Sequence, residues 1–166
     1  MIVVSDSTPL ITLMKAGTLE ILHSMFGTVQ IPEAVFFELT GNERFRDEAD
    51  MIRNCSFIQV VKVHDPSRVE FLQRVTGLDL GESEAIIFAD ETNADVLLMD
   101  EAAGRRVAKN MRLPLAGSVG ILVNACQLHL LSRDEAVAAF DRIRNANRHI
   151  SERLIQDALN VIYQEG

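Results

Sequence analysis

The sequence has few features that would mark a secreted, membrane-bound or zinc-binding protein. It contains only two cysteines, Cys55 and Cys126, which lie far apart and form no CxxC pair. We therefore expect reduced, buried thiols in a cytoplasmic protein, and no zinc site. No apolar run approaches the roughly 18 residues of a membrane span. The first residues also lack the basic flank and small-residue cleavage site of a signal peptide, so neither a membrane location nor secretion is expected.

Basic residues are in the minority. The 166 residues include 16 Lys and Arg against 24 Asp and Glu, which gives a net charge of -8. This balance argues against non-specific nucleic-acid binding through a broad basic face. It does not exclude a nucleic-acid enzyme, because carboxylates at a metal site contribute to the charge and bound cations reverse their local effect. The four histidines show no ligand spacing, so a metal site would use oxygen ligands.

Short extended runs alternate with amphipathic helices, without repeats or low-complexity linkers. This alternation predicts one domain with a parallel sheet between layers of helices. The expected strands are Ile2–Val4, Val29–Ile31, Phe57–Val61, Val96–Met99 and Leu113–Leu115. The expected helices are Thr8–Lys15, Thr18–Phe26, Pro32–Thr40, Asn42–Asn54, Asp65–Val75, about Glu82–Glu91, Glu101–Met111 and Ser118–Leu130, followed by two between Ser132 and Tyr163.

The first expected strand ends on a carboxylate. Asp6 follows this apolar run and precedes Ser7-Thr8-Pro9. At the carboxyl end of a parallel strand, Asp6 would lie where ligands bind in open α/β sheets. The alternative is that Asp6 only helps to start the next helix, where Thr8 suits the N-cap and Pro9 the first helical position.

Three more acids are candidates for the same site. Asp100 ends the fourth expected strand and would face Asp6 if the two strands are neighbours. Glu38 and Glu84 lie on largely apolar helices, where a charge is costly unless it is paired or bound to a cation. Each has a local alternative: Glu38 solvated or paired, Glu84 a first-turn acid, and Asp100 an N-cap. One carboxylate cluster with a divalent metal explains all four more economically.

Five segments carry a resemblance to a known family: SDSTPLI, PEAVFFEL, LGESEAII, VLLMDEAAGRRVA and LPLAGSVGIL. In this order, through roughly residues 1–131 and into the ISERLI tail, the sequence resembles the PIN-domain nucleases. The similarity is closest to a PIN-like branch of prokaryotic proteins related to the VapC toxins. It implies a PIN-like three-layer α/β/α fold with a short, roughly five-stranded parallel sheet. It also implies a single domain over residues 1–166, with a core of about 1–131 and a C-terminal helical extension of about 132–166.

The resemblance also assigns the site residues. The first metal-site aspartate of the family falls on Asp6, the middle glutamate on Glu38, the third acid on Glu84 and the fourth on Asp100. The third position holds glutamate where aspartate is more usual. The usual threonine-x-aspartate appears as Met99-Asp100-Glu101, so Glu101 is the alternative fourth acid.

The implied chemistry is metal-assisted phosphodiester hydrolysis. An all-oxygen site suits Mg²⁺ or Mn²⁺, which binds a phosphate oxygen, lowers the pKa of a bound water and stabilises the leaving oxygen. Asp6, Asp100 and Glu84 are the expected metal ligands, and Glu38 would ligate or orient the attacking water. By resemblance the protein is an endoribonuclease and the toxin of a prokaryotic toxin-antitoxin pair. Its expected partners are single-stranded or structured RNA, a small antitoxin protein and a second copy of the chain.

Four more residues are candidates for accessory roles. Ser7 and Ser118 are candidates for lining the site, although Ser118 also suits an N-cap. Arg105 and Arg106 are candidates for phosphate contacts. An i,i+4 ion pair between Glu101 and Arg105 is the alternative that needs no ligand.

Two other functions remain open. A catalytically inactive PIN-like module that binds protein or RNA is favoured by the acidic balance and by the altered third and fourth positions. A phosphotransfer domain also places aspartates at strand ends, but it predicts a paired acid after the first strand. Ser5-Asp6-Ser7-Thr8 has no such pair.

Overall fold

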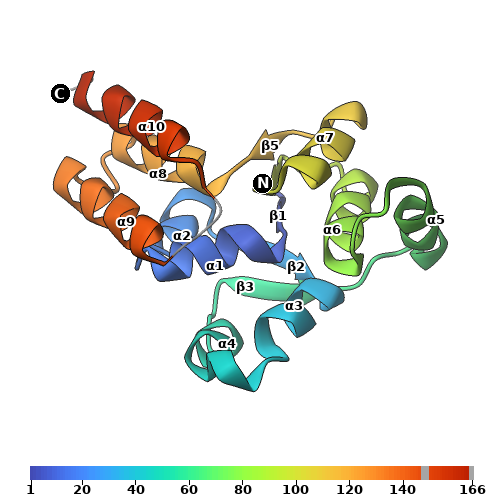
Figure 1. Ribbon diagram of the computed structural model, residues 1–166. Coiled ribbons are helices and arrows are strands. Elements are labelled where there is room, and N and C mark those ends of the chain that lie inside the picture. Colours follow the sequence, from blue (N-terminus) through green and yellow to red (C-terminus); the bar gives the residue numbers. More distant parts are fainter. Residues whose placement is uncertain (147–149, 165–166) are drawn as a thin grey trace.

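The sheet has five strands, all parallel, with helices on both faces (Figure 1). The computed structural model describes residues 1–146 and 150–164. The strands are β1 (Val3–Ser5), β2 (Val29–Pro32), β3 (Ile58–Val61), β4 (Val96–Leu98) and β5 (Leu115–Ala116). Their order is β3-β2-β1-β4-β5, so β1 and β4 are neighbours at the centre of the sheet. This confirms the predicted three-layer α/β/α fold.

The helices cover the two faces of the sheet in two groups. They are α1 (Ser7–Lys15), α2 (Ile21–Phe26), α3 (Glu33–Thr40), η1 (Glu43–Phe45, a 3-10 helix), α4 (Arg46–Arg53), α5 (Pro66–Thr76), α6 (Leu80–Glu91), α7 (Ala102–Asn110), α8 (Ser118–Gln127), α9 (Arg133–Asn145) and α10 (Glu152–Gln164). Val3 and Leu98 join the core built with α1, α8, α9 and α10. Val4 and Leu97 join the core built with α6 and α7. None of the helices that the structure describes is long and apolar enough to cross a membrane.

Several boundaries differ from those expected. The expected helix Asn42–Asn54 is divided into η1 and α4, and the expected helix Thr18–Phe26 begins only at Ile21. Helix α8 ends three residues before Leu130, because His129 has a φ of 57°, a left-handed conformation that terminates helices.

The two C-terminal helices belong to the main core. Figure 1 shows α9 and α10 packed together with α8. Phe140 and Ile143 of α9 and Ile155 of α10 are fully buried in the core that also covers α1. Arg142 Nη1 also donates to the carbonyl of Ala16, 3.0 Å away at the C-terminal end of α1. These helices therefore fix α1 against the sheet.

Candidate functional site

Asp6 lies directly after β1, at the N-terminus of α1. Its backbone N–H donates to the carbonyl of Leu98 at 3.0 Å, which continues the pairing of β1 with β4. Asp6 occupies the N-cap position of α1, yet its side chain makes no capping hydrogen bond. It is 2% exposed, and among the described residues its Oδ1 has no hydrogen-bond partner. Because an unpaired buried carboxylate oxygen is costly, starting the helix is not a sufficient explanation for Asp6.

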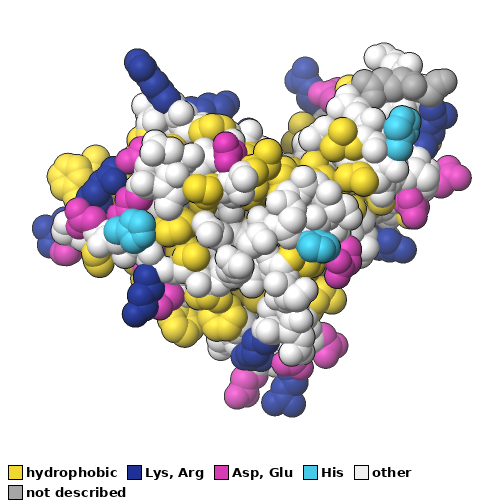
Figure 2. Space-filling view, turned by 180° about the vertical axis from the view of Figure 1, so that it is seen from behind, with side chains coloured by type: hydrophobic (Ala, Val, Ile, Leu, Met, Phe, Trp, Pro, Cys, Tyr) yellow, Lys and Arg dark blue, Asp and Glu magenta, His cyan; other side chains and the backbone are white. Residues whose placement is uncertain are grey.

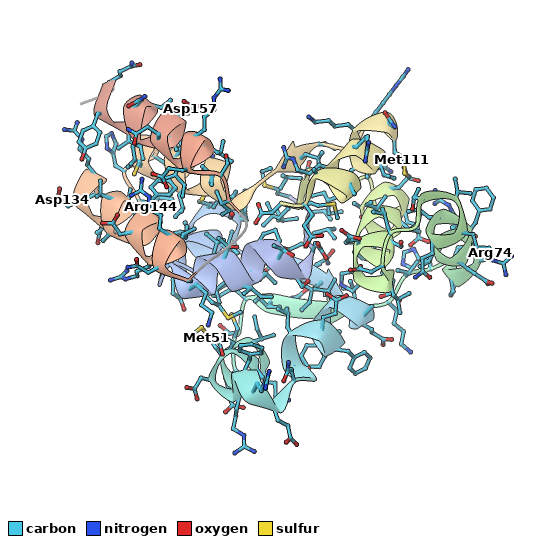
Figure 3. The ribbon with its side chains drawn as sticks, viewed as in Figure 1. Met51, Arg74, Met111, Asp134, Arg144 and Asp157 are labelled. Atoms are coloured by element: carbon cyan, nitrogen blue, oxygen red, sulfur yellow. The ribbon has the colours of Figure 1, made fainter. Side chains whose placement is uncertain are left out.

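Other carboxylates surround Asp6 where the N-terminus of α1 meets α3 and α6, and oxygen-tipped side chains gather there in Figure 3. The pKa of Asp6 is raised to about 8, mainly by burial and also by the charges of Glu38, Glu82 and Asp79. Glu101 adds its charge near Glu38 and Glu82. We call Asp6, Glu38, Asp79, Glu82 and Glu101 the acid cluster.

Glu38 reaches the acid cluster from the second half of α3. The hydroxyl of Ser7 donates to Glu38 Oε2 at 2.7 Å, so Ser7 contacts the cluster as expected. A Cβ atom at Gly81 would overlap Glu38 Oε1, so glycine is required there for the close approach of the carboxylate. Burial is the main cause that raises the pKa of Glu38, and the charges of Asp79 and Glu101 add to it.

Helix α6 contributes Glu82 to the cluster, in the place predicted for Glu84. Asp79 and Glu82 form a capping box: the Glu82 N–H donates to Asp79 Oδ1 at 2.8 Å, and Glu82 Oε2 accepts from the Asp79 N–H at 3.1 Å. Glu82 is 6% exposed, and burial together with Asp79 and Glu101 raises its pKa to about 7. Glu84 instead accepts from the N–H of Ala34 at 2.9 Å, in the first turn of α3.

One sequence signal points to Glu82. The pattern Asp79-x-x-Glu82 is typical of a helix N-terminus, and it starts α6 two residues before the expected boundary.

Asp100 turns away from the acid cluster towards α8. The Ser118 N–H donates to Asp100 Oδ1 at 2.7 Å, and the Ser118 hydroxyl donates to Oδ2 at 2.9 Å. Ser118, which was predicted as the N-cap of this helix, is instead the first residue of α8. Gly117 occupies the N-cap position. Asp100 is not the N-cap of α7 either, since Glu101 occupies that position.

Glu101 is the acid of this segment that joins the cluster. Thr8, predicted as a cap, is the second residue of α1, and its hydroxyl donates to Glu101 Oε1 at 3.1 Å. Arg105 Nη1 donates to the carbonyl of Met99 at 2.8 Å, and no ion pair between Arg105 and Glu101 forms in the part of the chain that the structure describes. Arg106 is exposed on α7. Phosphate contact by either arginine stays a prediction.

A groove of about 800 Å³ lies on the Asp100 side of the sheet edge, beside β5. Asp100 and Arg105 line it together with the start of α8, Leu154 of α10, and Met1 and Asp95, which precede β1 and β4. Seen from behind, the molecule is notched between two lobes at this place (Figure 2). Asp100 and the acid cluster therefore belong to different surroundings at the same edge of the sheet.

The acid cluster suits a hard cation by its chemistry. In residues 1–146 and 150–164, no three His, Cys, Asp or Glu side chains are already grouped so as to hold a metal ion. The donors are nevertheless all carboxylate oxygens, which Mg²⁺ and Mn²⁺ prefer, and Asp6 Oδ1 lacks a hydrogen bond. A cation at this oxygen would offset both the burial and the mutual repulsion of the carboxylates.

Comparison with known proteins identifies the family. A family model described as a PIN domain matches residues 2–164, nearly the whole chain. No curated protein matches the chain. The match agrees with the parallel sheet and with the resemblance carried by the five segments. The chain therefore belongs to the PIN-domain family, whose members are generally nucleases.

Proposed function

We propose that this protein is an endoribonuclease that depends on Mg²⁺ or Mn²⁺. The observation that carries the proposal is the buried Asp6 carboxylate, which has an oxygen without a donor and stands among other acids. In the metal-free protein this arrangement costs stability. A divalent cation compensates for that cost, and it also assists phosphodiester hydrolysis.

Four carboxylates of the acid cluster would hold the ion: Asp6, Glu38, Glu82 and Glu101. When bound, the ion supplies an activated water and stabilises the charge on the leaving oxygen. Glu38 is exposed to solvent and its pKa is raised, which suits it to accept a proton from the attacking water. Asp79 holds Glu82 through the capping box.

Two hydroxyl groups on the first turn of α1 position these carboxylates. Ser7 donates to Glu38 and Thr8 donates to Glu101. Donors of this kind fix the orientation of metal-binding carboxylates and are part of the site. The N-terminus of α1 thus carries Asp6 itself and the groups that orient two other acids.

The test is the Asp6→Asn variant. We expect it to lose Mn²⁺-dependent cleavage of single-stranded RNA, while its melting temperature stays equal or rises because the variant has no buried carboxylate to ionise. Cleavage by the purified variant at the wild-type rate would contradict the proposal. Calorimetric titration with Mn²⁺ should give heat with the wild type and far less with Asp6→Asn.

A second candidate is an inactive PIN-like module that binds protein or RNA. It is favoured by the finding that, within the described residues, no three possible ligands are grouped for a metal. It predicts that the wild type gives little heat with Mn²⁺ and that Asp6→Asn changes nothing in the titration.

We also propose that the protein is the toxin of a toxin-antitoxin pair, inhibited by a small partner protein, and that it forms a homodimer. The support is the resemblance to VapC-related proteins. Induced wild-type protein should arrest growth of a bacterial host, and Asp6→Asn should not. Light scattering should give twice the chain mass. Normal growth would contradict the toxin proposal, and a monomer mass would contradict the homodimer.

A further inference from the structure

A smaller cavity, of about 140 Å³, adjoins the acid cluster between α1, α3 and η1. Its apolar walls come from Ile11, Met14 and Leu39. Glu38 belongs both to this cavity and to the acid cluster. Ile11 is four residues along α1 from Ser7, a rise of about 6 Å. The cavity therefore lies about one helical turn along α1 from Ser7. We call it the α1–α3 cavity.

An exposed aromatic ring stands at this cavity. Phe45 of η1 lines it and is 49% exposed. Lys15 Nζ lies 5.8 Å from the centre of the Phe45 ring and forms an ion pair with Glu48. The ring is thus held in place without being part of the core.

Two arginines flank this ring in the sequence Arg44-Phe45-Arg46. Both are exposed, and neither side chain forms an ion pair with another residue that the structure describes. Aromatic rings combined with cations that follow a phosphate backbone are the usual means of binding single-stranded nucleic acid.

We infer that the α1–α3 cavity binds one base of single-stranded RNA, next to the phosphate that the acid cluster would hold. Phe45 stacks on the base. Asn42 also lines the cavity; its Oδ1 accepts from the Arg44 N–H, and its Nδ2 donates to the base edge. Arg44 and Arg46 contact the neighbouring phosphates. The position beside a reacting phosphate rests on the proposed nuclease function. The binding of a base in the cavity does not depend on that function.

RNA fits this cavity better than an apolar peptide does. Besides its apolar residues the lining includes the amide of Asn42 and charged side chains. Two unpaired arginines flank Phe45 in the sequence, and a base joined to phosphates offers a partner for the amide and for these arginines. A volume of about 140 Å³ also limits the occupant to a single flat group.

The test compares Phe45→Ala with Phe71→Ala. Phe71 is a matched control, because it is 68% exposed and lies on α5, which does not line the cavity. Binding is measured by fluorescence anisotropy in EDTA, with a labelled poly-U or poly-A oligonucleotide and with an abasic oligonucleotide of the same length. We expect Phe45→Ala to weaken binding of the oligonucleotides that carry bases by about tenfold and to leave the abasic one unchanged. Phe71→Ala should change neither.

Two further variants separate stacking from folding. Phe45→Tyr keeps an aromatic ring and should bind RNA as the wild type does, whereas Phe45→Leu keeps an apolar side chain and should bind as Phe45→Ala does. Equal loss of affinity for abasic RNA, or no loss with Phe45→Ala, would overturn the inference. Tighter binding of an apolar peptide than of poly-U would overturn it as well.

Parallel cleavage assays in Mn²⁺ distinguish the two proposals. If the wild type cleaves RNA and Phe45→Ala binds it normally, the base site is refuted and the nuclease stands. If nothing is cleaved but the Phe45 effect on binding is present, the base site stands and the nuclease is refuted.

The arginines are tested through the salt dependence of binding. Replacing Arg44 and Arg46 together by glutamine should reduce the slope of log K against log salt by about 1.4, since each phosphate contact on a single strand contributes about 0.7. Arg74→Gln is the control, because Arg74 is paired with Glu70 on α5, remote from the cavity (Figure 3). An unchanged slope in the double variant would refute the phosphate contacts.

Discussion

Asp6 and Asp100 follow adjacent strands and reach the same edge of the sheet, yet their surroundings are opposite. Both oxygens of Asp100 accept hydrogen bonds from Ser118. Asp6 is nearly inaccessible to solvent, has one oxygen without a donor, and is surrounded by other carboxylates. A carboxylate at a strand end is therefore not by itself a sign of a site. What marks the site is burial without donors, because that is the condition a cation relieves.

The strongest test of this comparison uses two glutamates of α6. Glu82→Gln removes a charge from the acid cluster, and we expect cleavage to fall at least about 100-fold, since loss of a secondary partner alone costs 10- to 100-fold. Glu84→Gln keeps an oxygen that accepts from the Ala34 N–H and should cleave like the wild type. Loss of cleavage with Glu84→Gln but not with Glu82→Gln would show that Glu84, and not Glu82, belongs to the site. Rates are measured on the same RNA.

The pH dependence of stability gives the second test. The pKa of Asp6 is about 8 in the folded protein and near 3.8 when unfolded, so the folded state retains a proton that the unfolded state releases between these values. Stability of the metal-free protein should fall as the pH rises through this window. Glu82, with a pKa of about 7, acts in the same direction.

This pH effect is measured by thermal melting in EDTA. From about pH 5 to about pH 8.5 the wild type should lose more than about 3 °C, since 1 kcal/mol corresponds to about 2–4 °C in a chain of this size. Asp6→Asn should lose clearly less, and Mn²⁺ should restore the wild type at the higher pH. Parallel losses in both proteins would mean that Asp6 is not the titrating group.

The third test concerns the space in which Glu38 lies. In Gly81→Ala the new methyl group collides with the Glu38 carboxylate, which must move, and we expect about tenfold weaker Mn²⁺ binding with the fold retained. Gly120→Ala is the control, because its Cβ meets nothing within 4 Å and helical alanine is favoured by up to about 1 kcal/mol. Equal Mn²⁺ affinity of both variants in calorimetry would exclude Glu38 as a ligand.

The smallest effect on activity is expected at Asp100. Asp100→Ala leaves the Ser118 N–H without its acceptor and should cost about 1–2 kcal/mol of stability. Asp100→Asn keeps one acceptor and should cost less. Cleavage by Asp100→Asn should stay within about threefold of the wild type, and the melting curve reports the stability change. Loss of cleavage with an unchanged melting temperature would indicate that Asp100 is a metal ligand.

The sequence was sufficient for the fold because its local signals agree. Apolar β-branched runs mark the strands, and Ser132 and Ser151 cap their helices as expected. Asp6 was predictable from its place at the carboxyl edge of the sheet, and Glu38 from its place on a largely apolar helix.

The remaining acids depend on information that the sequence does not contain locally. Helix α6 is buried on nearly all sides, so periodicity alone does not choose between Glu82 and Glu84. The choice between Asp100 and Glu101 depends on strand register. Ser5 pairs with Leu98, so Asp6 continues the face of Val4 while Asp100 continues that of Leu98.

The contact between Arg142 and Ala16 has a consequence for any shortened form of this protein. Deleting α9 and α10 would uncover the apolar flank of α1 and free its last turn. Since a short helix moves as a rigid rod, its opposite tip would shift too, and Asp6 with it. We therefore expect that truncating the chain at its C-terminus inactivates a site located near its N-terminus, although the two are separated by almost the full length of the polypeptide.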